Sequence, residues 1–392
     1  MGLKAILKKS KFTYAAARTL RKCPYPFLRF FQRAAHALRG VDAKKVYFSS
    51  FSGRLYNENP KYVCEALHEI CPEAKLVFRL NRAGMRQDDI PAYVTRVPQY
   101  SPRTLWHMAT ARVLVKNACL KPWMLKFPNQ TYIQLWHGDR GLKKILFDLR
   151  PNAEKIYQEW KCMDIGVSAS DFGSRVYMRR AMRFSGELIE CGYPKNDVLL
   201  ANPPEVAAET RRALHLPEGT KVLLYAPTFR DKNIGSAMQA GFSLKKLHAA
   251  LESSTGEKWL ILNRGHSNNA GLRADEGMDV SNFPDVSRLL LVTDMLITDY
   301  SSICGDFMLL DRPIILYHAD AESYAADDHG LVFDPAASPY QIAHSEAELI
   351  EMVCHPADPA ENCRALREFY GTKESGHASH TVAERIQKIL RS

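Results

Sequence analysis

Four short segments of this 392-residue chain combine residues suited to acid–base or phosphate chemistry, and each follows a short apolar run. In the first, the run 132–136 leads into His137 and Gly138, with Lys143 and Lys144 a few residues later. A histidine in such a position can accept a proton from a hydroxyl group near neutral pH. Gly138 would let a substrate approach the backbone closely. A structural histidine that caps a following helix explains the same residues equally well.

Two further segments carry side chains that could hold a phosphate group. Thr228 and Arg230 follow the apolar run 222–226, and Arg264 and His266 follow the next such run. The planar guanidinium of arginine donates to phosphate oxygens in a fork, and the hydroxyl and imidazole add further donors. Read singly, each segment is also compatible with an ordinary turn that carries a surface arginine.

The fourth segment begins where the apolar run 294–298 ends at Asp299. Ser301 and Ser302 then open a helix predicted to continue through residues 304–310. The free backbone N–H groups and the positive dipole end of a helix start favour a bound anion. Serine is also a favoured N-cap residue without any ligand, so the pair by itself leaves both interpretations open.

The elements that must position these segments form two series of short runs rich in Val, Ile and Leu. The runs are 45–50, 75–80, 112–117, 132–136 and 164–168, then 222–226, 259–263, 278–282, 294–298 and 313–318. Helical patterns separate the runs, which is typical of buried parallel strands in βα units. A stretch rich in proline near 193–205 divides the series. We therefore expect an α/β protein with two doubly wound Rossmann-like domains that face each other across a cleft.

The charge of the chain is concentrated at its start. Residues 1–40 contain ten basic side chains and no acidic one, whereas the rest of the chain holds 43 of each sign. The neutral body argues against a nucleic-acid partner. Residues 25–39 suit an amphipathic helix, with Phe27, Phe31, Ala34 and Leu38 on one stripe and the basic side chains facing the other way. This arm could bind an anionic membrane surface, or the helix could simply dock on its own domain.

Composition and simple motifs exclude several other classes of protein. The nine cysteines include no C-x-x-C pair, and no apolar stretch reaches the roughly 18 residues of a membrane span. Neither a P-loop nor a dinucleotide-binding G-x-G-x-x-G motif occurs. Scattered cysteines in so long a chain are typical of a protein in the reducing cytosol.

Taken together, these segments resemble a known family. The motifs are WHG with a following LKK (136–144), GYPKND (192–197), YAPTFRD (225–231), RGH (264–266) and the TDYSS stretch within 289–317. In this order they are similar to the CDP-glycerol glycerophosphotransferase family, which includes teichoic-acid primases and polymerases and related capsule-polymer enzymes. The resemblance spans about residues 45–375 and implies a GT-B fold whose terminal helix returns to the N-terminal domain.

The resemblance also implies a reaction and roles for residues. Glycerol phosphate, or another polyol phosphate, would move from CDP-glycerol or CDP-ribitol to a hydroxyl of a lipid-linked saccharide, with release of CMP. His137 would be the general base, His266 and Asp299 would complete the catalytic set, and Gly138, Lys143 and Lys144 would lie on the acceptor side. The donor phosphates would be held by Thr228, Arg230, Arg264, Ser301 and Ser302. No cofactor is expected, and we expect no obligatory metal because fixed cationic and N–H donors can stabilise the transferring phosphoryl group.

The chain departs from the family pattern in three places. Asp139-Arg140-Gly141 adds a residue and an acid after WHG, Lys195 stands where arginine is usual, and Cys304-Gly305 replaces bulkier residues. Because the first change follows the candidate base, it bears on the acceptor and its geometry more than on the donor. A primase-like enzyme that adds one or few units is favoured over a processive one. The alternatives are a GT-B glycosyltransferase that uses a nucleotide sugar and a non-catalytic protein recruited to membranes.

The expected organisation has four parts. Residues 1–40 would form the basic membrane-associating arm, 41–202 the acceptor domain and 203–370 the CDP-donor domain. Residues 371–392 would form a terminal helix that packs back on the first domain. The protein would act at the cytoplasmic face of the cell membrane as a peripheral protein.

Overall fold

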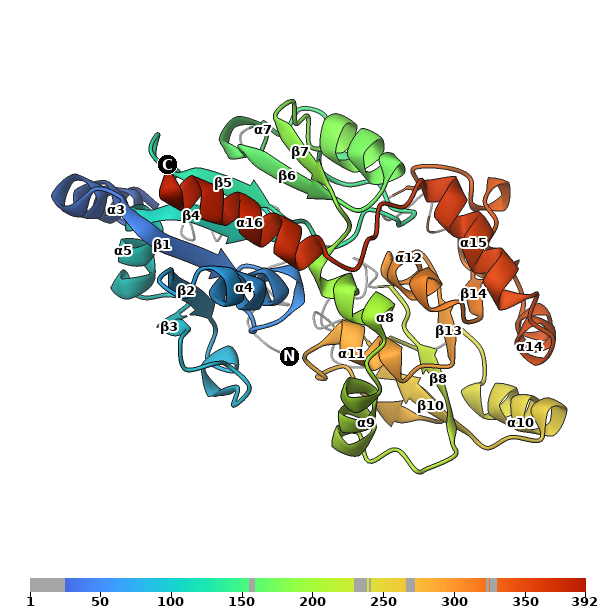
Figure 1. Ribbon diagram of the computed structural model, residues 1–392. Coiled ribbons are helices and arrows are strands. Elements are labelled where there is room, and N and C mark those ends of the chain that lie inside the picture. Colours follow the sequence, from blue (N-terminus) through green and yellow to red (C-terminus); the bar gives the residue numbers. More distant parts are fainter. Residues whose placement is uncertain are drawn as a thin grey trace, which may run out of the picture.

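The described part of the chain forms two parallel β-sheets, with helices packed around both (Figure 1). The structure is a computed structural model that describes residues 25–154, 159–228, 238–239, 241–265, 272–321, 324 and 330–392. Within these residues the first sheet has the order β3-β2-β1-β4-β5-β6-β7 and the second the order β12-β10-β8-β13-β14-β15. The expected α/β class with two parallel sheets is therefore confirmed.

The first sheet is built by residues 42–190. Its strands are β1 (Asp42–Ser49), β2 (Lys75–Leu80), β3 (Thr95–Pro98), β4 (Ala111–Lys116), β5 (Thr131–Gln134), β6 (Ile165–Ser168) and β7 (Glu187–Glu190). The helices of this part are α3 (Tyr25–Arg39), α4 (Glu58–Ile70), η1 (Gly84–Arg86), α5 (Pro102–Thr110), α6 (Leu146–Leu149), α7 (Glu159–Cys162) and η2 (Gly173–Ala181).

The second sheet is built by residues 221–343. Its strands are β8 (Lys221–Tyr225), β10 (Trp259–Asn263), β12 (Met278–Asp279), β13 (Met295–Thr298), β14 (Ile314–Tyr317) and β15 (Gln341–Ala343), and β9 (Met238–Gln239) pairs with β11 (Leu272–Arg273) apart from it. The helices that follow β7 in the chain are η3 (Pro194–Asn196), α8 (Asp197–Ala201), α9 (Pro204–Ala213), α10 (Leu244–Thr255), α11 (Val286–Leu291), α12 (Ile303–Phe307), η5 (Met308–Leu310), η6 (Pro335–Ala337), α14 (Glu346–Cys354), α15 (Pro359–Tyr370) and α16 (Ala378–Arg391).

All ten predicted strands are present, but the edge strands β3, β7 and β15 and the separate pair of β9 with β11 were not predicted. β3, β7 and β15 are only partly buried and carry polar side chains, so they lack the continuous apolar run that marks a central parallel strand. The predicted Pro-rich hinge is also more structured than expected, because it folds into η3, α8 and the start of α9.

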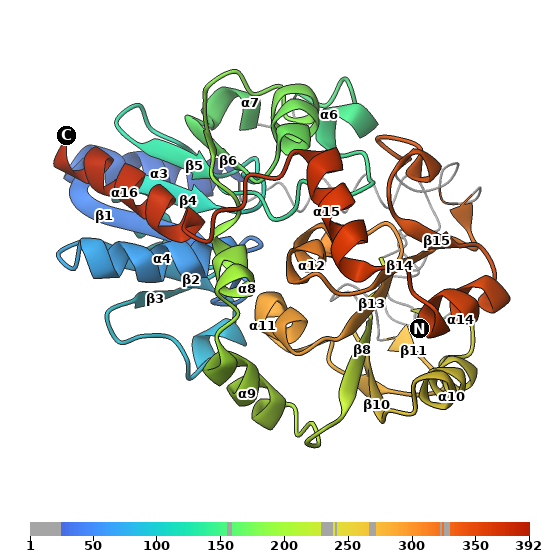
Figure 2. The ribbon, with the colours of Figure 1, turned by 45° about the vertical axis from the view of Figure 1, so that its right-hand side comes forward.

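The C-terminal segment connects the two sheets. Leu366 and Tyr370 of α15 belong to the core beneath the second sheet, whereas Val382 and Ile386 of α16 belong to the core beneath the first. Both views show the chain passing from α15 across to α16, which lies along β1 and β4 (Figures 1 and 2). The domain boundaries at residues 40, 202 and 370 stay predictions.

The helix predicted over residues 25–39 is present as α3, and it docks on the protein body. Arg29 donates to the carbonyl oxygen of Pro122, and the Nδ1 of His36 lies 2.9 Å from the carbonyl oxygen of Ala109. These two side chains therefore lie on the docked side of α3, away from the predicted apolar stripe, where they satisfy backbone carbonyls, whereas Arg33 is exposed. Residues 1–24 of the predicted arm lie outside the described residues.

Candidate active site

His137 lies three residues beyond the end of β5, at the carboxyl edge of the first sheet. Its Nδ1 lies 2.7 Å from the carbonyl oxygen of Asn117, and its half-buried ring meets the edge of the Phe51 ring at 5.2 Å between centroids. A carbonyl oxygen can only accept, so Nδ1 must carry the hydrogen in this contact. In the neutral ring Nε2 then holds the lone pair, which is the state that a general base requires.

Gly138 lies against the start of α12, which belongs to the second sheet's part of the molecule. A Cβ atom added at Gly138 would lie 2.3 Å from the Oγ of Ser302, and one added at Gly141 would lie 3.0 Å from the Cβ of Ser302. Only glycine permits such an approach. The segment with the candidate base and the segment with the candidate phosphate-binding serines, 165 positions apart in the sequence, therefore meet at one place.

Asp299 joins two strand ends of the second sheet. Its carboxylate accepts hydrogen bonds from the backbone N–H groups of Thr228, at 2.8 Å, and Tyr300, at 2.6 Å, and it is almost completely buried. These bonds hold the residue after β13 next to the segment after β8. Asp299 thus fixes Thr228 beside the TDYSS segment, and the structure brings these two predicted site residues together.

The predicted helix after TDYSS is present as the five-residue α12 followed by η5. Ser302 is its N-cap residue, and the Oγ of Ser301 lies 3.4 Å from the backbone N of Ile303. Both serines are partly exposed. Their hydroxyl groups are therefore placed at the junction with Gly138, where they can reach a ligand.

Arg264 follows β10 and has part of its hydrogen-bonding capacity committed to the protein. Its Nη1 donates to the carbonyl oxygens of Val280 and Phe283, each at 3.0 Å. Burial lowers the pKa of Arg264, while Glu58 and Asp285 act in the opposite direction. The guanidinium is thereby oriented by the protein. Arg230 and His266, the other predicted donors, lie outside the described residues.

Lys143 and Lys144 lie in a segment that pairs with the second part of the molecule. Lys143 forms an antiparallel bridge with Leu331, and the backbone N of Lys144 donates to the carbonyl oxygen of Gly330 at 3.2 Å. The hydroxyl of Tyr177 donates to the carbonyl oxygen of Lys143 at 3.1 Å. The predicted acceptor-side lysines thus belong to a backbone connection between the two halves of the molecule.

The sequence did not reveal a buried charge network beside this junction. Arg140 contacts Glu374 at 2.6 Å and Asp306 at 3.1 Å, and Lys195 contacts Asp306 at 2.6 Å and Glu58 at 3.6 Å. Burial tends to lower the pKa of Lys195, but Asp306 and Glu58 outweigh it and raise the pKa. Burial raises the pKa of Glu374 to about 7 despite the nearby Arg140. The network connects both sheets with the segment before α16.

The three departures from the family pattern meet in this network. Arg140 and Lys195 share Asp306, and a Cβ atom added at Gly305 would lie 2.4 Å from the Cβ of Arg140. Asp139, the acid added after WHG, accepts from the hydroxyl of Ser168 at 2.9 Å at the end of β6. The changes therefore fit one another, and they form a contact between the loop after His137 and α12.

The start of α4 is a second part of the site that the sequence did not reveal. Glu58 has a positive φ of 60°, and its buried carboxylate is the one that faces Lys195. Asn59 donates to the carbonyl oxygen of Trp136 at 2.9 Å and accepts from the backbone N of Lys195 at 3.0 Å. Strained, buried polar residues of this kind gather at functional sites. The sequence did offer one signal for a helix start here, the asparagines and the proline in Asn57-Glu58-Asn59-Pro60, because both residue types are common at that position.

The described residues contain neither a candidate metal site nor a candidate membrane-spanning helix. In that part of the chain no group of three or more His, Cys, Asp or Glu side chains could hold a metal ion. Among the described helices, none combines the length and apolar character needed to cross a membrane.

Comparison with known proteins gives one family. Residues 30–388 match the family model described as CDP-Glycerol:Poly(glycerophosphate) glycerophosphotransferase. The teichoic acid poly(glycerol phosphate) polymerase of Bacillus subtilis (strain 168) is 31% identical over 89% of this chain and 49% of its own length. The teichoic acid glycerol-phosphate transferase of Staphylococcus aureus (strain NCTC 8325 / PS 47) is 30% identical over 88% of this chain and 92% of its own. The chain thus spans about half the length of the first of these relatives.

Solved structures agree with the sequence comparison. The wall teichoic acid polymerase TagF is 26% identical, with a TM-score of 0.79 over 96% of this chain and 97% of that chain. A second TagF structure, of a variant with histidine replaced by asparagine, was obtained with CDPG. A UDP-GlcNAc 2-epimerase from Neisseria meningitidis, at 12% identity and a TM-score of 0.51, shares the fold alone.

Proposed function

We propose that this chain, which belongs to the CDP-Glycerol:Poly(glycerophosphate) glycerophosphotransferase family, transfers glycerol phosphate or a related polyol phosphate from CDP-glycerol to a hydroxyl of a lipid-linked saccharide. CMP would be released, and the product would belong to a teichoic-acid-like or capsule polymer. The observation that carries the proposal is the contact between Gly138 and Ser302, which brings the candidate base and the candidate phosphate-binding serines to one junction. We propose that this junction lies in a cleft between an acceptor domain and a donor domain.

In the proposed reaction His137 acts as the general base. Its Nε2 takes the proton of the acceptor hydroxyl, whose oxygen attacks the β-phosphorus of CDP-glycerol. The bond between that phosphorus and the bridging oxygen breaks, and the electron pair leaves with CMP. The carbonyl of Asn117 fixes the ring in the orientation and tautomer that this step needs.

The donor phosphates would be held by groups on the second sheet. Ser301, Ser302 and Arg264 would donate to phosphate oxygens, and Asp299 would keep Thr228 in place rather than touch the reacting atoms. Arg230 and His266 remain proposed partners of the same phosphates. Phosphoryl transfer depends mainly on positioning and electrostatic stabilisation, and such donors supply both.

Attachment to the cytoplasmic face of an anionic membrane is part of the proposal. The outward side of α3 exposes Phe27 at 75%, Phe30 at 72% and Leu38 at 81% of their surface, next to a sequence arm rich in basic residues. Apolar side chains flanked by cations are the pattern of an interfacial helix. Replacing these three residues by serine should weaken sedimentation with anionic vesicles at least tenfold; unchanged binding would remove this part of the proposal.

The donor assay tests the reaction itself. The protein is incubated with an acceptor and with CDP-glycerol, CDP-ribitol or UDP-sugars, and release of CMP or UDP is measured. We expect CMP, and the faster of the two CDP compounds identifies the polyol. Release of UDP alone would favour a GT-B glycosyltransferase, and no release from any donor would favour a membrane-recruited binding protein.

A further inference from the structure

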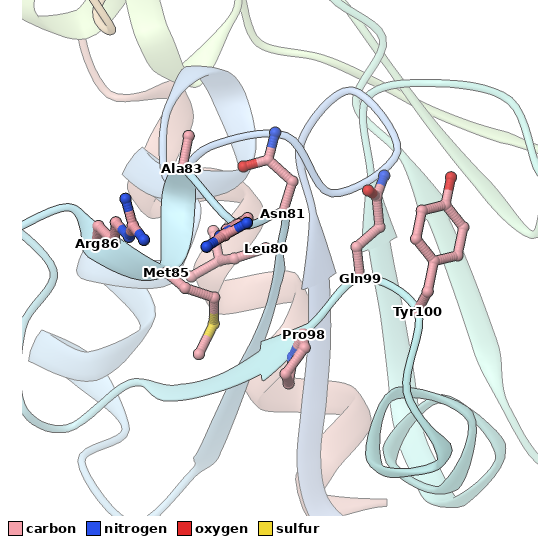
Figure 3. A pocket seen from close by; sticks show the side chains of 9 residues that line it. Leu80, Asn81, Ala83, Met85, Arg86, Pro98, Gln99 and Tyr100 are labelled. Atoms are coloured by element: carbon pink, nitrogen blue, oxygen red, sulfur yellow. The ribbon is translucent and has the colours of Figure 1, made fainter.

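A cavity of about 590 Å³ lies at the carboxyl ends of β2 and β3. Figure 3 shows that two chain segments line it, the turn after β2 and the segment that leaves β3. Its polar lining residues include Arg82, Arg86 and Gln99. Both arginines are exposed, and neither forms an ion pair with any described residue. Because parallel strands end at one edge of a sheet, this cavity shares its edge with His137, and its charge favours an anionic ligand.

A third arginine lies behind the wall of the cavity. Arg79 is only 1% exposed, donates from Nε to the carbonyl oxygen of Gln99 at 3.2 Å, and lies 5.8 Å from the ring of Tyr100. Both of these neighbours line the cavity. The Nη1 of Arg79 has no hydrogen-bond partner among the described residues. A buried guanidinium nitrogen without an acceptor is unfavourable, and a bound anion would remove that cost.

Further polar groups continue from Arg79 toward His137 across the sheet. Ser49 of β1 pairs with Lys116 of β4, and the next residue, Asn117, holds the His137 ring. The Oγ of Ser49 and the Nδ2 of Asn117 also find no partner within the described part of the chain. Burial and the nearby Arg79 lower the pKa of Lys116 to about 7, although Glu159 opposes them. Buried polar side chains on β2, β1 and β4 thus lie in the part of the sheet between the cavity and His137.

The loop after β1 connects the cavity to the base directly. Gln99 donates to the carbonyl oxygen of Ser52 at 2.6 Å, while the backbone N of Phe51 donates to Asn117 at 2.8 Å. Phe51 and Ser52 both have positive φ, at 41° and 63°. Non-glycine residues hold this conformation only where surrounding contacts impose it, which is common at ligand sites.

We propose that this cavity is an acceptor subsite that binds a phosphate group of the acceptor through Arg82 and Arg86, with Arg79 behind them. The acceptor would extend from the subsite along the Phe51–Ser52 loop to present its hydroxyl to His137. The inference rests on the proposed function, because it assigns the acceptor of that same reaction. What it adds is the place in the fold where a phosphodiester or a pyrophosphate of that acceptor would bind.

Direct binding tests the subsite without any turnover. The probe is glycerophosphoglycerol, a phosphodiester without a titrating group near neutral pH, added to the full chain while CMP occupies the donor site. We expect binding by wild type, and binding at least tenfold weaker by the Arg82→Gln/Arg86→Gln double variant. Arg175→Gln/Arg212→Gln removes two exposed arginines elsewhere and is the matched control for net charge. The proposal would be overturned if the Arg82→Gln/Arg86→Gln variant bound the probe as tightly as wild type does. It would also be overturned if wild type bound uncharged diglycerol as tightly as glycerophosphoglycerol.

A second arm distinguishes the sources of the phosphate group. In this arm a short-chain prenyl pyrophosphate replaces the phosphodiester. Tighter binding of the phosphodiester would assign the subsite to the growing chain, and tighter binding of the pyrophosphate would assign it to the lipid end of the acceptor. Failure of both probes to bind would overturn the proposal. If CDP-glycerol is not used but a probe still binds at Arg82 and Arg86, the proposed reaction fails and the subsite stands.

Steady-state kinetics supply an independent readout. The Arg82→Gln/Arg86→Gln variant should raise the KM for the acceptor at least tenfold, while kcat and the KM for CDP-glycerol stay within twofold. An increase in the KM for CDP-glycerol alone would place these arginines on the donor side and contradict the assignment.

Discussion

The molecule contains two pairs of buried basic side chains, Arg140 with Lys195 at the junction and Arg79 with Lys116 in the first sheet. The pairs differ in whether carboxylates neutralise their charge. Arg140 and Lys195 contact the carboxylates of Asp306, Glu374 and Glu58, and the pKa of Lys195 is raised. Arg79 and Lys116 form no ion pair with any described residue, and the pKa of Lys116 is lowered to about 7. All four side chains are less than 5% exposed.

The difference separates a structural role from a binding role. A buried cation that meets carboxylates from other segments holds those segments together, and removing one partner leaves an uncompensated charge. A buried cation without a carboxylate carries its desolvation cost in the free protein, which an anionic ligand can offset. The first pair therefore fixes the junction at which Gly138 meets Ser302 at the start of α12. For the second pair, Arg79 contacts the Trp123 ring and Lys116 contacts the Met124 sulfur, and we propose that a bound anion completes the compensation of its charge.

The largest expected effect on the compensated pair comes from Asp306→Ala. The variant leaves Arg140 and Lys195 without their shared partner, and we expect a loss of about 3–5 kcal/mol in the free energy of unfolding. Urea unfolding measures it. Glu154→Ala, which removes a carboxylate from a partly exposed ion pair with Arg183, is the control and should cost less than about 1 kcal/mol. Equal losses in the two variants would show that the network does not hold the junction.

The pH dependence of stability sharpens the comparison between the two lysines. Between the lowered pKa of Lys116 and its ordinary value of 10.5, the unfolded chain holds a proton that the folded chain lacks. Wild type should therefore gain stability relative to Lys116→Met as pH rises from 7 to 9, by up to about 1.4 kcal/mol per pH unit. The charged and titratable groups that act on Lys116 are Arg79, Glu159, Cys119 and Lys121.

Lys195→Met is the control for this experiment. Because the pKa of Lys195 is raised, both folded and unfolded chains keep its proton between pH 7 and 9. The difference in unfolding free energy between wild type and Lys195→Met should stay constant over this range. Parallel pH profiles for wild type and Lys116→Met would contradict the assignment of Lys116 as an uncompensated cation.

The smallest expected effect concerns the packing beside the compensated pair. In Gly305→Ala the new Cβ would meet the Cβ and the carbonyl oxygen of Arg140 at 2.4 and 2.6 Å, so the loop after His137 must shift. We expect a loss of about 1–3 kcal/mol in the free energy of unfolding, together with reduced turnover. Gly256→Ala, at the C-cap of α10 with a positive φ and no atom within 4 Å of the added Cβ, should lose stability through backbone strain but keep wild-type turnover. It thereby separates a general loss of stability from displacement of the loop after His137. Wild-type turnover and stability in Gly305→Ala would show that the loop tolerates displacement.

The sequence predicted the strands and the junction better than it predicted the buried charges. Apolar runs such as 75–80 and 259–263 have the observed strand bounds, because a central parallel strand must be apolar on both faces. The rule that ligands bind at carboxyl strand ends predicted that the segments with His137 and Ser302 face one another, and Gly138 does approach Ser302. The pairing of Arg140 with Asp306 could not be predicted, since it depends on a contact across 166 residues. Arg79 and Lys116 were not recognised because each lies inside an apolar strand pattern.

The most direct test of the central claim is the turnover of His137→Ala with CDP-glycerol and acceptor. The account predicts a fall in kcat of about 10²–10⁴-fold, with the Kd for CDP-glycerol within twofold of wild type. His36→Ala is the matched control, because the Nδ1 of His36 also faces a backbone carbonyl but lies on α3, and it should keep wild-type turnover. Turnover of His137→Ala within twofold of wild type would contradict the assignment of the base and, with it, the role of the junction.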